Sequence, residues 1–515
     1  MTFTLSSRIR QGAHRCGFVT GPVRNLLVGL GLTTVGGDTS GGRPPSRLVS
    51  APRSPMTEGL IQRSRPQRMR FRVIRPPRWI TGALIFLAGG LLSTFSELIA
   101  SPTPARPNIL LIVSDDQAWT DHGFMGHPTI RTPHLDRLAA RSLCFTRGYV
   151  PSSLCCPSLA SLITGRYPHQ HGVVCNDPPR PPGITAAEFY RSDAYRAGRE
   201  RLSSFLEQTP TLPRLLQKRG YLSFQSGKWW QNEFSRGGFT HGMTRGDRHG
   251  DAGLEIGRVT MKPIEDFVAM AERENRPWLV WYAPMMPHDP HTPPERFLAR
   301  HRGLSPSLPV ARYHGMVEWF DETCGQLLEF LEKRGSADNT LVIFVTDNGW
   351  ITDPKTGRYA PRSKQSPYDG GLRTPILVGW PGRVKPQRDD THAVSSLDLM
   401  PTILRAAGLD IPATLPGIDL LDPRAVRHRS SVSGECFTHD GVDLDKPESG
   451  LRWRWIVHDG WKLIQPTPWN EPNAKPELYR IVEDPFERSD VASRHPMQVG
   501  RLRRELEKTW KPTAP

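Results

Sequence analysis

The chain lacks several features that would narrow its function. None of its nine asparagines lies in an Asn-x-Ser/Thr sequon, which an exported eukaryotic protein of this size would often carry. Its seven cysteines form no CxxC pair and no zinc-like spacing. The sequence therefore excludes a disulfide framework and a cysteine zinc site. Cys144 or Cys175 could still pair with Cys156, and the spacing does not decide between them.

Lysine is missing from residues 1–104, which hold 14 arginines against three acidic residues and so carry a net charge of +11 (14 − 3). The whole chain carries +16, which leaves only +5 for residues 105–515. No basic, aromatic-laced surface is needed to explain this mild excess, and we predict no nucleic-acid partner. A weak positive field suits an anionic substrate.

The N-terminal part divides into two segments. Residues 1–68 are rich in Arg, Gly, Pro and Ser, a composition typical of disorder. Residues 69–104 follow the order of a secretory signal, with a basic run at 69–78, an uncharged apolar run at 79–95 and small residues after it. That apolar run is shorter than the ~20 residues of a spanning helix. An uncleaved anchor stays open, and it would be the only contact with a membrane.

A secretory signal normally begins a chain. We therefore expect synthesis to start at Met69 or Met56, and the segment upstream to be an artefact of start assignment. Export without glycosylation sequons favours the periplasm or cell envelope of a bacterium.

Three continuous apolar runs, at residues 108–113, 278–283 and 341–346, predict strands buried on both faces. Helices are expected between and after them, at residues 212–219, 315–333 and 396–408. This alternation predicts an α/β fold with a doubly wound, mostly parallel sheet flanked by helices, occupying residues 105–425.

Residues 426–515 have a different pattern. Short strands are expected at residues 431–436, 453–457, 461–464 and 477–481, with a closing helix at 498–510. The sequence therefore predicts a smaller C-terminal subdomain that combines an antiparallel sheet with one helix.

Acidic and amide residues follow two of the predicted strands. Asp115 and Asp116 come after the first strand, and Asp347 and Asn348 after the third. Ligands of open α/β sheets bind beyond the carboxyl ends of the strands, so both pairs could face one pocket. Three carboxylates and one amide oxygen are a reasonable set for calcium or magnesium. The alternative is that these are ordinary turn residues.

Residues 155–166 (CCPSLASLITGR) carry a cysteine, one spacer, Pro-Ser, and an apolar run closed by Thr-Gly-Arg. This pattern resembles the sulfatase signature. Further blocks resemble the same family in the same order: residues 108–117, 154–172, 227–229, 284–294, 347–375 and 477–487. Several blocks in order are far more specific than one. The resemblance spans roughly residues 105–510 and implies an alkaline-phosphatase-like fold.

In that family the cysteine is oxidised to formylglycine. The resemblance implies that Cys155 is converted by a formylglycine-generating enzyme, and that the aldehyde hydrate is both a metal ligand and the nucleophile. One hydroxyl of the hydrate would attack sulfur, and the other would then expel sulfate. Serine would instead leave a stable sulfate ester.

The resemblance also assigns the remaining site residues. Asp115, Asp116, Asp347 and Asn348 would hold a divalent cation, calcium in preference to magnesium, together with Cys155. Lys228 and Lys364 would hold sulfate oxygens. His288 would contact sulfate or protonate the leaving alcohol, with His291 beside it as a second candidate. No role is assigned to His169 and His171.

Two positions depart from the family pattern. Leu159 stands where an arginine usually follows Pro-Ser, and Arg166 is the candidate replacement. Trp230 stands where a histidine usually follows Gly-Lys-Trp. Trp229 and Trp230 are therefore either a wall that stacks on sugars or part of the core.

We interpret the chain as an exported sulfatase that hydrolyses a sulfate monoester, on a sulfated small molecule or carbohydrate. Two alternatives stay open: a phosphoester hydrolase on the same fold, and a non-catalytic sulfoglycan-binding protein. Leu159 motivates the second alternative, because the usual arginine helps the maturation enzyme to recognise its target.

Overall fold

The computed structural model describes residues 106–515. The segments expected at residues 1–68 and 69–104 lie outside these residues. Within residues 106–515, no helix combines the length and the apolar character needed to cross a membrane.

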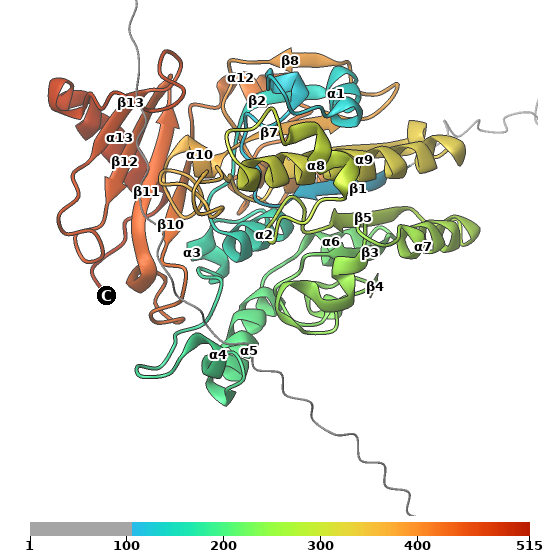
Figure 1. Ribbon diagram of the computed structural model, residues 1–515, viewed down its shortest axis with the longest axis horizontal. Coiled ribbons are helices and arrows are strands. Elements are labelled where there is room, and N and C mark those ends of the chain that lie inside the picture. The colour runs from blue at the N-terminus through green and yellow to red at the C-terminus, as the bar shows by residue number, and fades with distance from the viewer. Residues whose placement is uncertain (1–105) are drawn as a thin grey trace, which may run out of the picture. The chain divides into compact units, whose positions relative to one another are not determined.

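A large sheet forms the centre of the described chain (Figure 1). Its strands run in the order β4, β3, β5, β1, β6, β7, β2, β8, with β9 also paired to β2. Their bounds in that order are His241–Gly242, Leu222–Gly227, Trp278–Ala283, Asn108–Ser114, Thr340–Thr346, Arg373–Gly379, Leu143–Tyr149, Gln387–Asp389 and Val394–Ser395. The first five strands in this order, from β4 through β3, β5 and β1 to β6, are parallel to one another. Strand β7 is antiparallel to both β6 and β2.

Strand β1 lies between β5 and β6, which explains its unbroken apolar sequence. Ile109, Leu111 and Val113 enter the core on one face of the sheet, and Leu110 and Ile112 enter the core on the other. Both faces are therefore covered, as expected for a strand inside a parallel sheet.

Helices cover the two faces. One core is built by α2 (Cys155–Thr164), α5 (Asp193–Gln208), α6 (Leu212–Gln217) and α11 (Leu399–Ala406). The other is built by α1 (Pro133–Ala140), α7 (Lys262–Arg273) and α9 (Leu308–Lys333). The shorter helices are α3 (Pro168–His171), α4 (Ala186–Phe189), α8 (Glu295–His301), α10 (Asp369–Leu372) and α12 (Pro423–His428).

A second, four-stranded antiparallel sheet is built from the C-terminal residues, drawn in orange to red in Figure 1. It comprises β10 (Ser431–Phe437), β11 (Leu451–His458), β12 (Trp461–Pro466) and β13 (Glu477–Arg480), and α13 (Pro496–Thr509) packs on it. The two sheets share a core, in which the rings of Tyr149 and Trp455 lie 5.5 Å apart.

The predicted fold class is confirmed, including the C-terminal antiparallel sheet with its helix. One predicted helix is longer than expected: α9 begins at Leu308 rather than near residue 315. Ser307 caps it by accepting a hydrogen bond from the Val310 N–H, and a proline in the first turn suits a helix start. The predicted boundary between residues 105–425 and 426–515 stays a prediction.

Candidate active site

The carboxyl ends of β1 and β6 bring both acidic pairs together. Ser114 and Thr346 are paired in parallel register, and the Asp347 N–H donates to the Ser114 carbonyl at 2.8 Å. One residue later, the Asp116 N–H donates to Asp347 Oδ1 at 3.0 Å. The two pairs therefore share one pocket although 231 residues separate Asp116 from Asp347.

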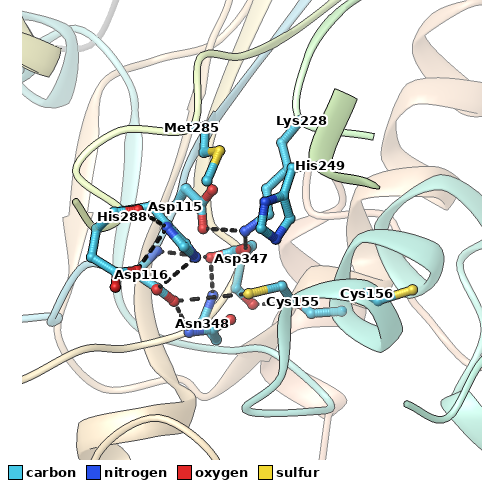
Figure 2. Close-up of polar contacts among 12 residues, drawn as sticks. Asp115, Asp116, Cys155, Cys156, Lys228, His249, Met285, His288, Asp347 and Asn348 are labelled. Atoms are coloured by element: carbon cyan, nitrogen blue, oxygen red, sulfur yellow. Dashed lines mark hydrogen bonds and ion pairs between the residues drawn. The ribbon is translucent and has the colours of Figure 1, made fainter. Parts of the chain in front are cut away.

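Asp116 is the hub of the cluster (Figure 2). Its Oδ1 accepts from Asn348 Nδ2 at 2.6 Å and lies 3.9 Å from Cys155 Sγ. Its Oδ2 accepts from Lys364 Nζ at 2.6 Å and lies 3.4 Å from His288 Nε2. Its backbone is left-handed, with φ 62°, a conformation that aspartate tolerates better than most residues. This turn gives Asp116 its central position.

Cys155 is the first residue of α2, whose N-terminal end faces the acidic cluster. The helix ends at Gly165, where φ is 64° and an added Cβ would lie 2.8 Å from the Met400 sulfur. Ser158 Oγ ties the helix to the cluster by donating to the Asp347 carbonyl at 2.5 Å. Burial raises the pKa of the Cys155 thiol to about 12. An unmodified Cys155 is therefore a protonated thiol and no nucleophile near neutral pH.

Both predicted lysines are buried within the cluster. Lys228 Nζ donates to Asp115 Oδ1 at 2.7 Å and lies 3.8 Å from Asp347 Oδ2. Burial alone would lower the pKa of Lys228 and of Lys364, but the nearby carboxylates, Asp115 and Asp116 respectively, raise both pKa values above the ordinary range. Both side chains are therefore ammonium cations.

His288 enters the cluster with a defined orientation. Its Nδ1–H donates to the Asp289 carbonyl at 2.6 Å, which leaves Nε2 facing Asp116. Burial, reinforced by the Lys228 charge, holds the pKa of His288 well below its usual value. The ring is therefore neutral and presents an unprotonated Nε2 to the pocket.

The cluster fits a hard divalent cation. Three of its buried oxygens have no hydrogen-bond partner in the described chain: Asp115 Oδ2, Asp347 Oδ2 and Asn348 Oδ1. Ligand atoms of Asp115, Asp116, Cys155 and His288 all lie within 4.8 Å of one another. Buried carboxylate and amide oxygens without partners are costly unless something binds them. Oxygen donors of this kind are those that calcium and magnesium prefer.

The structure thus brings together all eight side chains predicted for the site: Asp115, Asp116, Cys155, Lys228, His288, Asp347, Asn348 and Lys364. Their individual roles stay predictions.

The prediction that Arg166 replaces the missing arginine is wrong. Arg166 lies beyond the C-terminal end of α2 and donates to Thr414 Oγ1 at 3.0 Å, so it does not enter the cluster. Leu159 is buried in the core on that face of the sheet. No arginine of residues 155–166 therefore enters the cluster in place of the one that usually follows Pro-Ser.

The two tryptophans belong to the core. Trp229 and Trp230 are each only 1% exposed, which rules out a sugar-stacking wall. Trp229 packs edge-to-face on Phe239 and Trp281.

Other candidate groups have structural contacts. His291 packs against Tyr313 and Trp350, and no hydrogen bond joins it to the cluster within residues 106–515. His169 pairs with Glu435, and His171 lies 3.0 Å from Ser161 Oγ. The six described cysteines are free, so the pairing left open for Cys156 is not formed.

One nearby residue, His249, could not be predicted from the sequence. Its ring lies 5.7 Å from that of His288, centroid to centroid, and Figure 2 shows it beside the end of the Lys228 side chain. It comes from a loop that resembles none of the family blocks, so no local pattern could have identified it.

Comparison with known proteins matches the chain to the sulfatase family. The sulfatase family model matches residues 107–409, and the model for the C-terminal part of N-sulphoglucosamine sulphohydrolase matches residues 357–511. Arylsulfatase A of Homo sapiens is 32% identical over 389 residues, covering 64% of this chain and 70% of the relative. N-acetylgalactosamine-6-sulfatase of Homo sapiens is 30% identical over 373 residues, covering 62% and 66%.

Among solved structures, Ps i-CgsB in complex with k-i-k-neocarrahexaose matches with a TM-score of 0.63 and 24% identity, covering 79% of this chain and 93% of that one. This likeness supports the fold. The chain therefore belongs to the sulfatase family of sulfuric ester hydrolases.

Proposed function

We propose that the protein hydrolyses a sulfate monoester on a carbohydrate, using a formylglycine made from Cys155 and a bound calcium ion. One observation carries the proposal: Cys155 lies beside a buried cluster of oxygen donors, three of which lack partners. The names of the relatives and the sugar bound in a structural neighbour support the carbohydrate class.

Asp115, Asp116, Asp347 and Asn348 would hold the cation through their oxygens. When bound, a hard divalent cation polarises the sulfate group and lowers the pKa of a nearby hydroxyl. The charges of the cluster favour this occupant. Three carboxylates and two ammonium groups leave one negative charge, which repels an anionic ester; a divalent cation changes the sum to one positive charge, which attracts it.

The Cys155 sulfur marks the place of the hydroxyl oxygens of a formylglycine hydrate. Conversion would supply a hydrate with two hydroxyl groups. One would be the nucleophile, and the other would allow sulfate to leave. The raised thiol pKa supports this proposal, because the unmodified side chain offers no thiolate at neutral pH.

The remaining side chains would bind and orient the ester. Lys228 and Lys364 are buried cations on two sides of the cluster, placed to hold sulfate oxygens as negative charge develops. His288 presents an unprotonated Nε2 to the pocket, where it could accept the proton of the attacking hydroxyl and pass it to the leaving alcohol.

We also propose export to the periplasm or cell envelope of a bacterium, through the segment at residues 69–104. Its basic, apolar and small-residue order is the support.

The test is mass analysis of the peptide that spans Cys155, after expression with a formylglycine-generating enzyme. We expect a sulfur atom to be exchanged for oxygen with loss of two hydrogens. Cys155→Ala should abolish hydrolysis of sulfated sugars, whereas Cys156→Ala, which removes the neighbouring thiol that accepts from Gln231 at 3.1 Å, should not.

Each alternative gives a different result. An unconverted Cys155 with intact binding of sulfated sugars would indicate a sulfoglycan-binding protein. Faster turnover of phosphate esters than of the matching sulfate esters would indicate a phosphoester hydrolase.

A further inference from the structure

His249, which comes from another loop, packs against Trp230, the residue that stands where the family pattern usually has a histidine. The ring of His249 packs edge-to-face on Trp230, with centroids 4.6 Å apart, and lies 5.7 Å from His288. Lys228 Nζ lies 5.9 Å from the Trp230 ring centroid. Figure 2 shows His249 beside the end of the Lys228 side chain. Although residue 230 is not a histidine, another histidine, His249, therefore lies next to it.

The backbone of this loop is held in an unusual conformation. His249 has φ 72°, and Gly250 follows with φ 128°. The His249 carbonyl accepts from the Trp229 N–H at 3.0 Å, and an added Cβ on Gly250 would lie 2.5 Å from the Gly227 carbonyl. The loop is thus pinned to the Gly-Lys-Trp segment. A left-handed histidine costs free energy and persists where the surroundings enforce it, often at functional sites.

Arg248 fixes the tautomer of His249. Its guanidinium donates to both oxygens of Asp177, at 3.0 and 2.9 Å, and its Nη1 lies 2.8 Å from His249 Nε2. Because arginine can only donate, Nε2 accepts and the ring proton of the neutral histidine is on Nδ1. Within residues 106–515 the Nδ1–H has no hydrogen-bond partner.

The two histidines are therefore complementary. His288 is fixed by its Nδ1–H and offers the lone pair of Nε2. His249 is fixed through Nε2 and offers an N–H. A sulfate oxygen needs a donor, and only the second ring supplies one in its neutral state.

We propose that the Nδ1–H of His249 donates a hydrogen bond to a sulfate oxygen of the bound ester, with Arg248 as its positioning residue. His249 thereby supplies, from a distant loop, the histidine missing at position 230. The inference rests on the proposed function only for the identity of the ester.

The first test is hydrolysis of 4-nitrophenyl sulfate by the matured, calcium-loaded full chain. His249→Ala should lower kcat/KM about 100-fold, the effect of removing one donor to a developing charge. His249→Asn should retain activity to within about tenfold, because its amide can place an N–H near Nδ1 and asparagine tolerates positive φ. His241→Asn is the matched control; its ring contacts Thr240 and Phe267, and activity should be unchanged.

The second test measures binding of inorganic sulfate by calorimetry to the unmatured protein with calcium, which separates the inference from the chemistry. His249→Ala should weaken binding at least tenfold, and Arg248→Met should weaken it less. Equal sulfate binding by wild type and His249→Ala, or no binding by wild type, would overturn the inference. A wild type that binds sulfate through His249 but hydrolyses no sulfate ester would overturn the proposed function alone.

Discussion

Two buried clusters of lysine and carboxylate residues lie in this molecule, and they differ in how completely they are paired. The first is the candidate active site around Asp116. The second, which we term the clamp, consists of Asp369, Lys462 and Glu487 and joins the short helix α10, just before β7, to the C-terminal residues. Lys462 Nζ lies 2.7 Å from Asp369 Oδ1 and 2.8 Å from Glu487 Oε1.

The remaining oxygens of the clamp also have donors. The Asp369 N–H donates to Glu487 Oε2 at 2.7 Å, and the Tyr149 hydroxyl lies 3.2 Å from Asp369 Oδ2. In the active site, by contrast, Asp115 Oδ2 and Asp347 Oδ2 have no hydrogen-bond partner in the described chain. Glu487 Oε1 also lacks a hydrogen bond, but it is in ion-pair contact with Lys462 at 2.8 Å, whereas the nearest cation to Asp347 Oδ2 is Lys228 at 3.8 Å. Similar side chains therefore serve two purposes: a closely ion-paired cluster holds structure, and a cluster with oxygens left free of close contacts can bind a ligand.

The largest expected difference is in activity. Asp116→Asn removes the charge that pairs with Lys364, and we expect kcat/KM for a sulfate ester to fall by about 1,000-fold, on the order of 4 kcal/mol. Asp369→Asn makes the same change in the clamp and should leave kcat/KM of the folded protein within a few-fold of wild type. Equal losses in both variants would refute the division of roles.

Stability should respond in the opposite way. Lys462→Met leaves two carboxylates buried without their cation, and we expect the free energy of unfolding to fall by about 3–5 kcal/mol. Urea denaturation followed by circular dichroism measures this loss. A loss below about 1 kcal/mol would mean that the clamp does not stabilise the fold.

The clamp should also make stability depend on pH. Burial raises the pKa of Glu487 from 4.5 to about 7, despite the attraction of Lys462. A carboxyl with a raised folded-state pKa stabilises the protein fully below its unfolded-state pKa, and that contribution is lost as pH rises from about 4.5 to about 7, by at most about 3 kcal/mol. Glu487→Gln removes this titration. The unfolding free energies of wild type and variant should therefore diverge between pH 5 and pH 8, with wild type losing more; parallel curves would contradict the assignment.

The smallest effect is expected at an exposed pair of the same chemistry. Lys262 Nζ and Asp266 Oδ1 lie 2.5 Å apart on α7, and the two side chains are 69% and 63% exposed. Lys262→Met should change the free energy of unfolding by less than about 0.5 kcal/mol. The same denaturation series measures it, and a loss comparable to that of Lys462→Met would show that burial is not what distinguishes the clamp.

Much of the fold could be predicted from the sequence, because burial on both faces gives β1, β5 and β6 unbroken apolar runs. The metal-binding candidates could be predicted for a related reason: Asp115 and Asp347 directly follow strands whose ends meet. Each of these signals is local, and the parallel sheet converts local position into spatial proximity.

The residues that escaped prediction depend on contacts between distant segments. His249 reaches the pocket only because its loop is pinned to the Gly-Lys-Trp segment. Lys462 and Glu487 lie 93 and 118 residues from Asp369, with no spacing that connects them. The place of Trp230 in the core could not be predicted either, because a sequence does not show whether a tryptophan is exposed.

The hydrogen bond between Asp116 and Asp347 also bears on the order of events during synthesis. A nascent chain cannot bring the four oxygen-donor residues together until Asn348, the last of them, has emerged and β6 has joined β1. A cation that recognises only the finished arrangement would therefore bind after these strands have folded together. Its binding energy would then add to the stability of the whole α/β body, rather than to any fragment of it.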